Sequence, residues 1–294
     1  MHGAALKTAY SGVILSNEAA IFVVTQRRIK RFDVAENPSG IRARQAWSTA
    51  ITHGSHVLLY VEDTFLIVTD TSGAHYGLSV ETGEILWETK PVGEGDVGVI
   101  LDDGSFLFAS WDGAIQHLDP ESGHDLTAPR NLDRQMRNLH VTDNGSLFFV
   151  EYVRSTVDTL PGKERLCRLD WPSLNCMILA NSVDGAKVAV SPDGRRIALV
   201  ESDNTLKIRR LSSEQTEYQT ELPGPMHYYG QPVWSANSQQ IAVVIENGHA
   251  LFLVENLELI SIFHSSYPAP AVFSPTASLV LLCDWSDAKL VRNA

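Results

Sequence analysis

The side chains that could do chemistry are scattered along this sequence, and their spacing matches none of the common catalytic patterns. The chain has ten histidines and three cysteines, yet it contains no nucleophile elbow, phosphate-binding loop, HExxH segment or Cys-x-x-Cys pair. His53 and His56 share a short segment, and two histidines at this spacing are a weak signal for a metal. We therefore expect no catalytic residue, no metal site, no cofactor and no enzymatic activity.

Carboxylates and large aromatic rings recur at more regular distances and are better candidates for binding. A carboxylate follows an apolar run at six places, namely Asp70, Asp112, Glu151, Asp203, Glu246 and Asp284. Trp111, Tyr152 and Trp285 each stand directly beside one of these carboxylates. Residues so far apart in the chain can act together only if a repeated structure brings the ends of successive elements to one edge.

Such a repeat runs through the whole sequence with a period of about 43 residues. The clearest copy, residues 188–211, reads as an apolar run, a tight turn, a second apolar run, another turn and an alternating run. Turn signals between the first two runs fall at Asn17, Glu62-Asp63, Asp103-Gly104, Asn144-Gly145, Asp193-Gly194, Asn237-Ser238 and Pro275-Thr276. All-strand repeats of this length are typical of β-propeller blades.

We predict one all-β domain, residues 1–294, folded as a seven-bladed β-propeller with four-stranded antiparallel blades. The last copy supplies only three strands, so the segment 4–10 is free to add the missing outer strand and close the ring without an open sheet edge. The predicted blades are residues 12–50, 51–90, 91–130, 131–180, 181–222, 223–264 and 265–294 together with 4–10.

Several segments carry a family resemblance. Residues 112–123 (DGAIQHLDPESG) resemble the third strand and turn of the WD-repeat family, and Ser191-Pro192-Asp193-Gly194 is similar to that family's turn between the first two strands. Residues 81–87 (ETGEILW) are similar to quinoprotein-like repeats. The resemblance implies a rigid platform for binding another macromolecule. Trp234 and Phe273 match core positions, and Trp47 and Trp87 fall on outer strands, where we expect them to pack between blades.

Composition limits the partners. The net charge of −12 argues against nucleic acid, whose phosphates need a basic stripe, and favours a basic or mixed-charge protein. The basic residues of the fifth copy (Arg195, Arg196, Lys207, Arg209 and Arg210) alternate along strands, so we expect them to be scattered over a solvated surface.

No apolar run reaches the length of a membrane span, and the first residues do not resemble a secretory signal. We expect a cytoplasmic protein, monomeric by itself, that does not bind membranes.

The three cysteines do not indicate a disulfide framework, because their number is odd. Cys167 and Cys176 flank a predicted turn and could face each other across a hairpin. Two readings of this pair remain open: a disulfide bridge, or two small buried side chains, which we favour. Cys283 lies in an apolar run and is expected in the core.

The turns between second and third strands, and the connections leading into the blades, should gather on one face of the ring. This reasoning predicts an acidic face carrying Trp, Tyr and His. The predicted contact residues are Asp70, Trp111, Asp112, Tyr152, Arg154, Asp203, His227, Tyr228, Tyr229, Glu246, Tyr267, Asp284 and Trp285. Aromatic side chains of this kind are common anchors at interfaces.

Other readings of the same residues stay open. Asp and Asn are good turn formers, so backbone geometry alone can explain the acids. The carboxylates Asp70, Asp112, Asp203, Glu246 and Asp284 could in principle surround a cation. The long polar loop 154–163 is either a functional segment or a tolerated insertion.

We therefore expect a non-enzymatic protein-interaction module, or scaffold, that binds its partner through the acidic, aromatic face. An inhibitor or immunity protein acting on a basic enzyme, and a subunit of a larger complex, both fit this reading. The alternative is a ligand-binding or hydrolytic propeller with a site at the mouth of the central channel.

Overall fold

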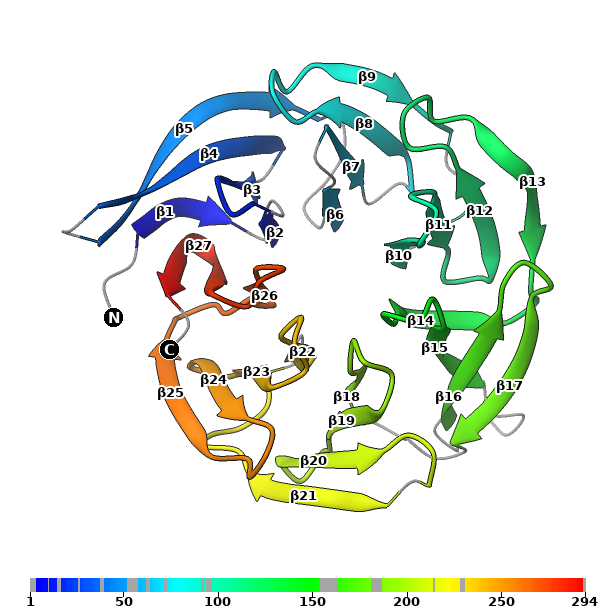
Figure 1. The fold of residues 1–294 in the computed structure, drawn as a ribbon, viewed down its shortest axis with the longest axis vertical. Helices are drawn as coiled ribbons and strands as arrows, with labels where there is room; N and C mark the ends of the chain where they lie inside the picture. Colours follow the sequence, from blue (N-terminus) through cyan, green and yellow to red (C-terminus); the bar gives the residue numbers. More distant parts are fainter. Residues whose placement is uncertain are drawn as a thin grey trace.

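The computed structural model describes residues 4–9, 11–14, 17–25, 27–37, 40–51, 58–61, 64–70, 73–90, 93, 97–153, 163–180, 187–213, 215–227 and 231–292. All elements in these ranges are β-strands, and none of these residues forms a helix long and apolar enough to cross a membrane. The strands make seven antiparallel sheets arranged around a ring, viewed down the shortest axis of the molecule in Figure 1. The prediction of an all-β, seven-bladed propeller is confirmed.

Six blades have four strands each, running in chain order from the centre of the ring outwards (Figure 1). Blade 1 holds β2 (Ser11–Ile14), β3 (Ala20–Thr25), β4 (Arg28–Asn37) and β5 (Gly40–Ala50). Blade 2 holds β6 (Leu58–Val61), β7 (Phe65–Thr69), β8 (His75–Ser79) and β9 (Ile85–Glu88). Blade 3 holds β10 (Val97–Ile100), β11 (Phe106–Ala109), β12 (Ala114–Leu118) and β13 (Asp125–Asn131).

The other four-stranded blades follow the same order. Blade 4 holds β14 (Gln135–Val141), β15 (Leu147–Val153), β16 (Lys163–Asp170) and β17 (Asn175–Ala180). Blade 5 holds β18 (Lys187–Val190), β19 (Arg196–Val200), β20 (Thr205–Arg210) and β21 (Thr216–Glu221). Blade 6 holds β22 (Val233–Trp234), β23 (Gln240–Ile245), β24 (Gly248–Leu253) and β25 (Leu259–His264).

The seventh blade closes the ring with segments from both ends of the sequence, as predicted. It contains β26 (Val272–Phe273), β27 (Leu279–Arg292) and β1 (Ala4–Ala9). The first part of β27 pairs with β26 and its second part pairs with β1. The blade differs from the prediction in having three strands, because the expected second and third strands form the continuous element β27. Glu18 of blade 1 also accepts hydrogen bonds from Thr276 and Ser278 of this blade.

The second strand of each four-stranded blade is buried because neighbouring blades cover both of its faces. In β19, for example, Ile197 and Leu199 pack in a cluster shared with blade 4, whereas Ala198 and Val200 pack in one shared with blade 6. The third runs of several repeats, such as Ile115–Asp119 and Leu206–Leu211, alternate between apolar and polar residues, a pattern that predicts one buried and one more exposed face. This holds for β20 but not for β12, which is buried throughout because its polar side chains have partners inside the sheet: His117 Nε2, for instance, lies 2.8 Å from the hydroxyl of Ser105.

Two tryptophans on outer strands fasten blades to their neighbours. Trp47 in β5 donates its Nε1–H to the carbonyl oxygen of Val80 in blade 2 at 2.9 Å. Trp87 in β9 donates in the same way to Pro120 of blade 3, also at 2.9 Å. A Cβ placed on Gly83 would lie 2.5 Å from the Trp47 ring, so the turn must be glycine for the indole to approach. The expectation that both tryptophans pack between blades is confirmed.

Cys167 and Cys176 lie in adjacent strands of blade 4, β16 and β17, and pack in one core cluster. Cys167 pairs in register with Ile178 instead of Cys176, and all three cysteines are free, so the possible bridge does not exist. Cys283 is buried, as expected for the core. Trp234 and Phe273 are also buried, in agreement with their predicted core positions.

Candidate functional site

The turns between second and third strands lie at the same end of the blades as the ends of the fourth strands. Antiparallel pairing requires this arrangement. Leu132, after the fourth strand of blade 3, donates its backbone N–H to Gly113 in such a turn at 2.9 Å. Ser265 donates to Asn247 in the same way in blade 6, at 3.0 Å. We call this end of the ring the 2–3 rim, and the opposite end, with the turns between first and second strands, the 1–2 rim.

Two predicted contact residues, Trp111 and Tyr152, stack on each other at the 2–3 rim. Trp111 occupies the turn between β11 and β12 of blade 3, and Tyr152 lies near the end of β15 in blade 4. Their ring centroids are 6.0 Å apart and their planes differ by 29°. The guanidinium of Arg137 lies 4.2 Å from the Trp111 ring centroid and 5.0 Å from that of Tyr152. We call these three residues the rim stack.

Strand register holds the rim stack in place. Tyr152 pairs with Glu164 in β16 and with Gln135 in β14, and Arg137 stands two residues from Gln135 on the same side of the sheet. Arg137 donates from Nη1 to Glu164 Oε1 at 2.9 Å. The two rings are half-buried, so each keeps part of its surface in contact with solvent. The arrangement therefore presents fixed aromatic surface, which costs little side-chain entropy when a partner binds.

Glu151 was expected at a turn beside Tyr152, but the structure places it inside β15. Its side chain is buried, and it forms ion pairs with Arg134 at 2.8 Å and with Arg165 at 3.9 Å. Side chains alternate across a strand, so Glu151 and Tyr152 point to opposite faces of the blade. Glu151 therefore stabilises the blade internally and adds no negative charge to the rim.

Two further predicted acids are also withdrawn from the surface. Asp70 is 1% exposed, and its carboxylate accepts hydrogen bonds from the hydroxyl of Tyr76 at 3.0 Å and from the amide of Ala74 at 3.2 Å. Asp284 is 6% exposed and accepts hydrogen bonds from the Ser265 hydroxyl and the Tyr267 amide. Both belong to the internal bonding of their blades, which corrects the expectation that they face a partner.

Other predicted residues remain on the 2–3 rim. The carboxylates of Asp112, Asp203 and Glu246 belong to exposed residues, and Tyr267 is 65% exposed. Hydrogen bonds from the hydroxyl and then the amide of Thr205 hold the pKa of Asp203 below its usual range, so it carries a negative charge at neutral pH. His227 is half-buried. Arg154, Tyr228, Tyr229 and most of the loop 154–163 lie outside the described residues, as does the side chain of Trp285.

The described residues do not assemble a metal centre. They contain no group of three or more His, Cys, Asp or Glu side chains that could hold a metal ion. Cys167 lies in β16 of the same blade as Tyr152, and its sulfur lies 3.7 Å from Glu151 Oε2. Burial, together with the negative charge of Glu151, raises the pKa of this thiol to about 12, so it is protonated and a poor nucleophile.

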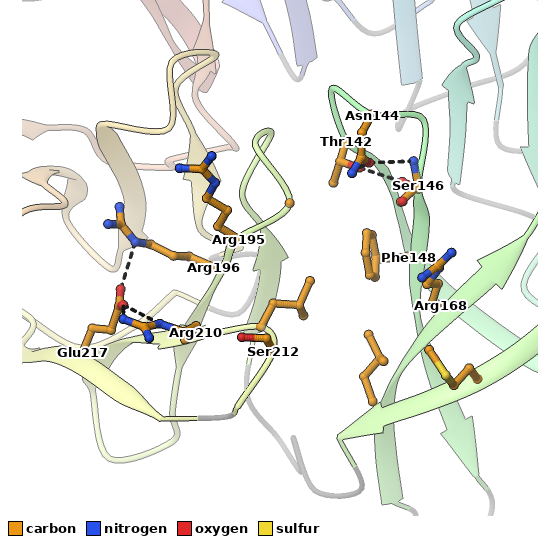
Figure 2. Close-up of a pocket in the computed structure, with 14 residues that line it drawn as sticks. Thr142, Asn144, Ser146, Phe148, Arg168, Arg195, Arg196, Arg210, Ser212 and Glu217 are labelled. Carbon is orange, nitrogen blue, oxygen red and sulfur yellow. Dashed lines mark hydrogen bonds and ion pairs between the residues drawn. The ribbon is translucent and has the colours of Figure 1, made fainter.

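Sequence reasoning missed a pocket at the 1–2 rim, between blades 4 and 5 (Figure 2). Its volume is about 550 Å³, and Phe148, Met177, Leu179 and Leu211 form its apolar lining. Met177 is 50% exposed and forms part of this apolar lining. No sequence motif marks the pocket, because its walls come from strands and turns of two blades that lie far apart in the sequence.

Four arginines also line this pocket, but they do not converge on one point. Figure 2 shows the guanidinium groups of Arg196 and Arg210 turned to Glu217 instead of towards Phe148. These ion pairs measure 2.9 and 2.8 Å. The pocket therefore has a basic margin without being a cradle for an anion. The basic cluster of the fifth copy is divided, as expected, since Lys207 and Arg209 pair with Glu201 instead.

Comparison with known proteins gives one family. A family model described as outer membrane protein assembly factor BamB, of the quinoprotein type, matches residues 26–126 and, in a second alignment, residues 47–220. This agrees with the quinoprotein-like character of residues 81–87, whereas the WD-repeat likeness receives no specific support. No curated protein matches this chain.

Proposed function

This chain belongs to the family described as outer membrane protein assembly factor BamB, and on that premise we propose that it is a non-enzymatic protein-interaction module. The family description names an assembly factor, and by analogy we propose that this chain contacts other proteins as a subunit of a complex. The single observation that carries the proposal is the rim stack of Trp111, Tyr152 and Arg137.

The chemistry of the rim stack suits a protein interface. Trp, Tyr and Arg are the residue types that most often dominate binding energy, and here they are held together before any partner arrives. The rings bring apolar area, while the guanidinium can also stack on or hydrogen-bond to a partner. The rim stack bridges blades 3 and 4, so its geometry depends on the folded ring and not on one flexible loop.

We further propose that the partner is basic or of mixed charge. Asp112 directly follows Trp111, and the exposed carboxylates of Asp203 and Glu246 belong to equivalent turns of blades 5 and 6. The net charge of −12 acts in the same direction. Such charges accelerate the approach of a basic partner, and salt screens the effect.

Affinity purification with variants of the rim stack tests the proposal. The chain is used to capture partners from its native cells at several salt concentrations, and each recovered partner is then titrated in purified form. Trp111→Ala and Tyr152→Ala should each weaken binding at least about 30-fold, because truncating an interface anchor costs about 2 kcal/mol or more. Rising salt should slow association.

Leu126→Ala is the matched control, since Leu126 is 51% exposed on the outer strand β13 and lies in no described aromatic contact. Thermal unfolding of all variants shows that the ring is intact. If the Trp111 and Tyr152 variants bind every recovered partner as tightly as Leu126→Ala does, the rim stack is not the contact site.

A further inference from the structure

The register of the outer strands identifies one equivalent position in successive blades. To find it, one takes the residue just after the end of the third strand, which is Val80 in blade 2. The residue three places earlier lies in the third strand, and its partner in the fourth strand occupies the equivalent position. In blade 1 it is Trp47, paired with Arg31, and in blade 2 it is Trp87, paired with Gly77. Each indole inserts against the following blade, where it hydrogen-bonds the residue just after the third strand, Val80 in the case of Trp47.

Blade 5 has an aromatic ring at the same position. Tyr218 pairs with Ile208 and packs on the core cluster shared by blades 5 and 6, which contains Val254 and Leu257 of blade 6. Leu257 stands three residues after Val254, where the blades that receive tryptophan have glycine. An aromatic ring can therefore occupy this kind of slot without a glycine in the turn.

Blade 4 leaves the equivalent slot open. The position is Met177, which pairs with Arg168, and its side chain is 50% exposed. On the facing blade, Leu211 takes the place of Val80: its amide bonds Arg195 at 2.8 Å just as the Val80 amide bonds Thr64 at 3.1 Å. The pocket of about 550 Å³ lies between these two blades, with the buried ring of Phe148 in its lining (Figure 2).

We propose that this pocket receives an aromatic side chain from a protein partner, in the place that Trp47, Trp87 and Tyr218 fill at other blade junctions. The volume is within the range of pockets that bind ligands, roughly 300–1,000 Å³, and the four apolar side chains among its lining residues favour an apolar occupant. Three blades place an aromatic ring in this slot, whereas blades 3 and 6 carry Thr127 and Ser261 at the equivalent position. The proposal rests on the proposed function only in taking the occupant to come from a protein.

The margin of the pocket indicates what should flank that aromatic residue. Four arginines line the pocket: Arg196 and Arg210 pair with Glu217, and Arg168 pairs with Asp170 at 3.4 Å. Arg195 is exposed, and no carboxylate among the described residues forms an ion pair with it. An acidic residue next to the aromatic ring would meet Arg195 on an otherwise negative protein, so the expected segment is an aromatic residue flanked by Asp or Glu.

Methyl-labelled methionine provides a direct readout of the pocket. The chain has four methionines, and Met177 belongs to the pocket lining whereas Met136 is buried in blade 4. The probe is a short peptide with one tryptophan flanked by glutamates, and the control peptide has alanine in place of the tryptophan. An indole in the pocket should move the Met177 methyl signal upfield in a saturable manner and leave the Met136 signal unchanged. The alanine peptide should not do so.

Two substitutions at this position make the test decisive. Met177→Trp should fill the pocket with the chain's own indole ring. Met177→Glu should place a carboxylate in the pocket, and the half-exposed position should allow the protein to fold with this charge. Both should lower binding of the fluorescently labelled tryptophan peptide at least tenfold, whereas Leu126→Glu, on an equally exposed outer-strand position, should leave it unchanged. Thermal unfolding confirms that each variant is folded.

The proposal is overturned if no saturable shift occurs at Met177, if the alanine peptide shifts it equally, or if the two Met177 variants bind the tryptophan peptide like the wild type. These outcomes are independent of the rim stack. Trp111 lies at the opposite rim, so Trp111→Ala should not alter the Met177 signal. If Trp111→Ala loses partner capture and the tryptophan peptide causes no Met177 shift in the wild type, the proposed function stands and only this inference is refuted.

Discussion

Carboxylate side chains buried within the blades are bonded to neighbouring side chains, whereas the same residue types at the rims are exposed to solvent. Asp70 and Asp203 stand at equivalent turns, yet one carboxylate is bonded inside its blade and the other is exposed. A single neighbouring side chain accounts for the burial of Asp70, because the hydroxyl of Tyr76 donates a hydrogen bond to its carboxylate. Turn positions could be predicted from the sequence, but which acids turn inwards could not, because a residue in another strand decides it.

Cys167 should resist alkylation in the folded protein. Its pKa of about 12 leaves almost no thiolate at pH 8, and the side chain is buried beside Glu151. Peptide mapping after treatment with iodoacetamide should find Cys167 unmodified, while the half-buried Cys176 reacts faster and both react in denaturant. Equal rates for the two cysteines in the folded state would contradict the assigned burial.

His75 should make the protein less stable in mild acid. Burial lowers the pKa of this fully enclosed side chain to about 4, with Asp70 opposing the shift, whereas the unfolded chain has a value of 6.5. Between these values the unfolded state binds one more proton, so stability falls as pH falls, by about 1.4 kcal/mol per pH unit. The loss stops once the folded pKa is passed.

Urea unfolding at several pH values measures this contribution. His75→Gln should be less stable than the wild type at neutral pH, since the contacts of the ring with Thr69 and Phe108 change. Its stability should nevertheless fall less steeply between pH 6.5 and 4. An unchanged slope would show that other groups cause the acid sensitivity.

At the level of strands and turns, inter-blade fastening depends on glycines that are close to a ring. Gly123 and Gly104 both have positive φ, of 69° and 82°, so alanine is strained at either position. Only Gly123 also lies against an indole: a Cβ there would be 2.6 Å from the ring of Trp87, whereas nothing lies within 4 Å at Gly104. We expect Gly123→Ala to be destabilising by roughly 1–3 kcal/mol more than Gly104→Ala.

The comparison of the two alanine variants in urea unfolding isolates the packing contribution, because both include the cost of the left-handed backbone. Similar stabilities would mean that the turn moves away from Trp87 at no cost. Fluorescence of the tryptophans reports whether the indole keeps its buried environment in each variant.

The strands themselves were largely predictable, because apolar runs separated by Asp-Gly or Asn-Gly turns have few alternatives. The exceptions follow from contacts beyond the local pattern. β12 alternates in sequence but is buried on both sides, since His117 and Gln116 find hydrogen-bonding partners in Ser105 and Asp125. Glu151 was expected in a turn, but β15 continues to Val153. A local pattern does not reveal a partner in the adjacent strand.

At the level of the whole molecule, ring closure depends on β1, and removing it should destabilise the protein. Residues 4–9 pair with the second part of β27, which would otherwise be an open edge in the seventh blade. A variant that lacks residues 1–10 should have a lower Tm and should elute partly as oligomers in size-exclusion chromatography, because open edges pair with other chains. A monomeric variant with the Tm of the full chain would show that β1 is dispensable for closure.

The number of blades was predictable from the repeat period, whereas the differences among junctions were not. The rim stack needs Trp111, Tyr152 and Arg137 from two blades, and the pocket lies beside Met177, at a position where three other blades carry an aromatic ring. Both features depend on pairs of side chains about one repeat apart. Only the register of the folded strands shows which residues occupy equivalent places.

The lack of an aromatic ring at Met177 should also affect how firmly blades 4 and 5 hold together. Rings inserted at three other junctions resist separation, but the seam between blades 4 and 5 has no such wedge. Under tension or on heating, the circle should therefore part at this seam before it parts at those three. Divided there, the polypeptide would give one fragment with β1 and four whole blades, and a second fragment with two whole blades and the other strands of the seventh, so that spontaneous reunion of the two could serve as a split reporter.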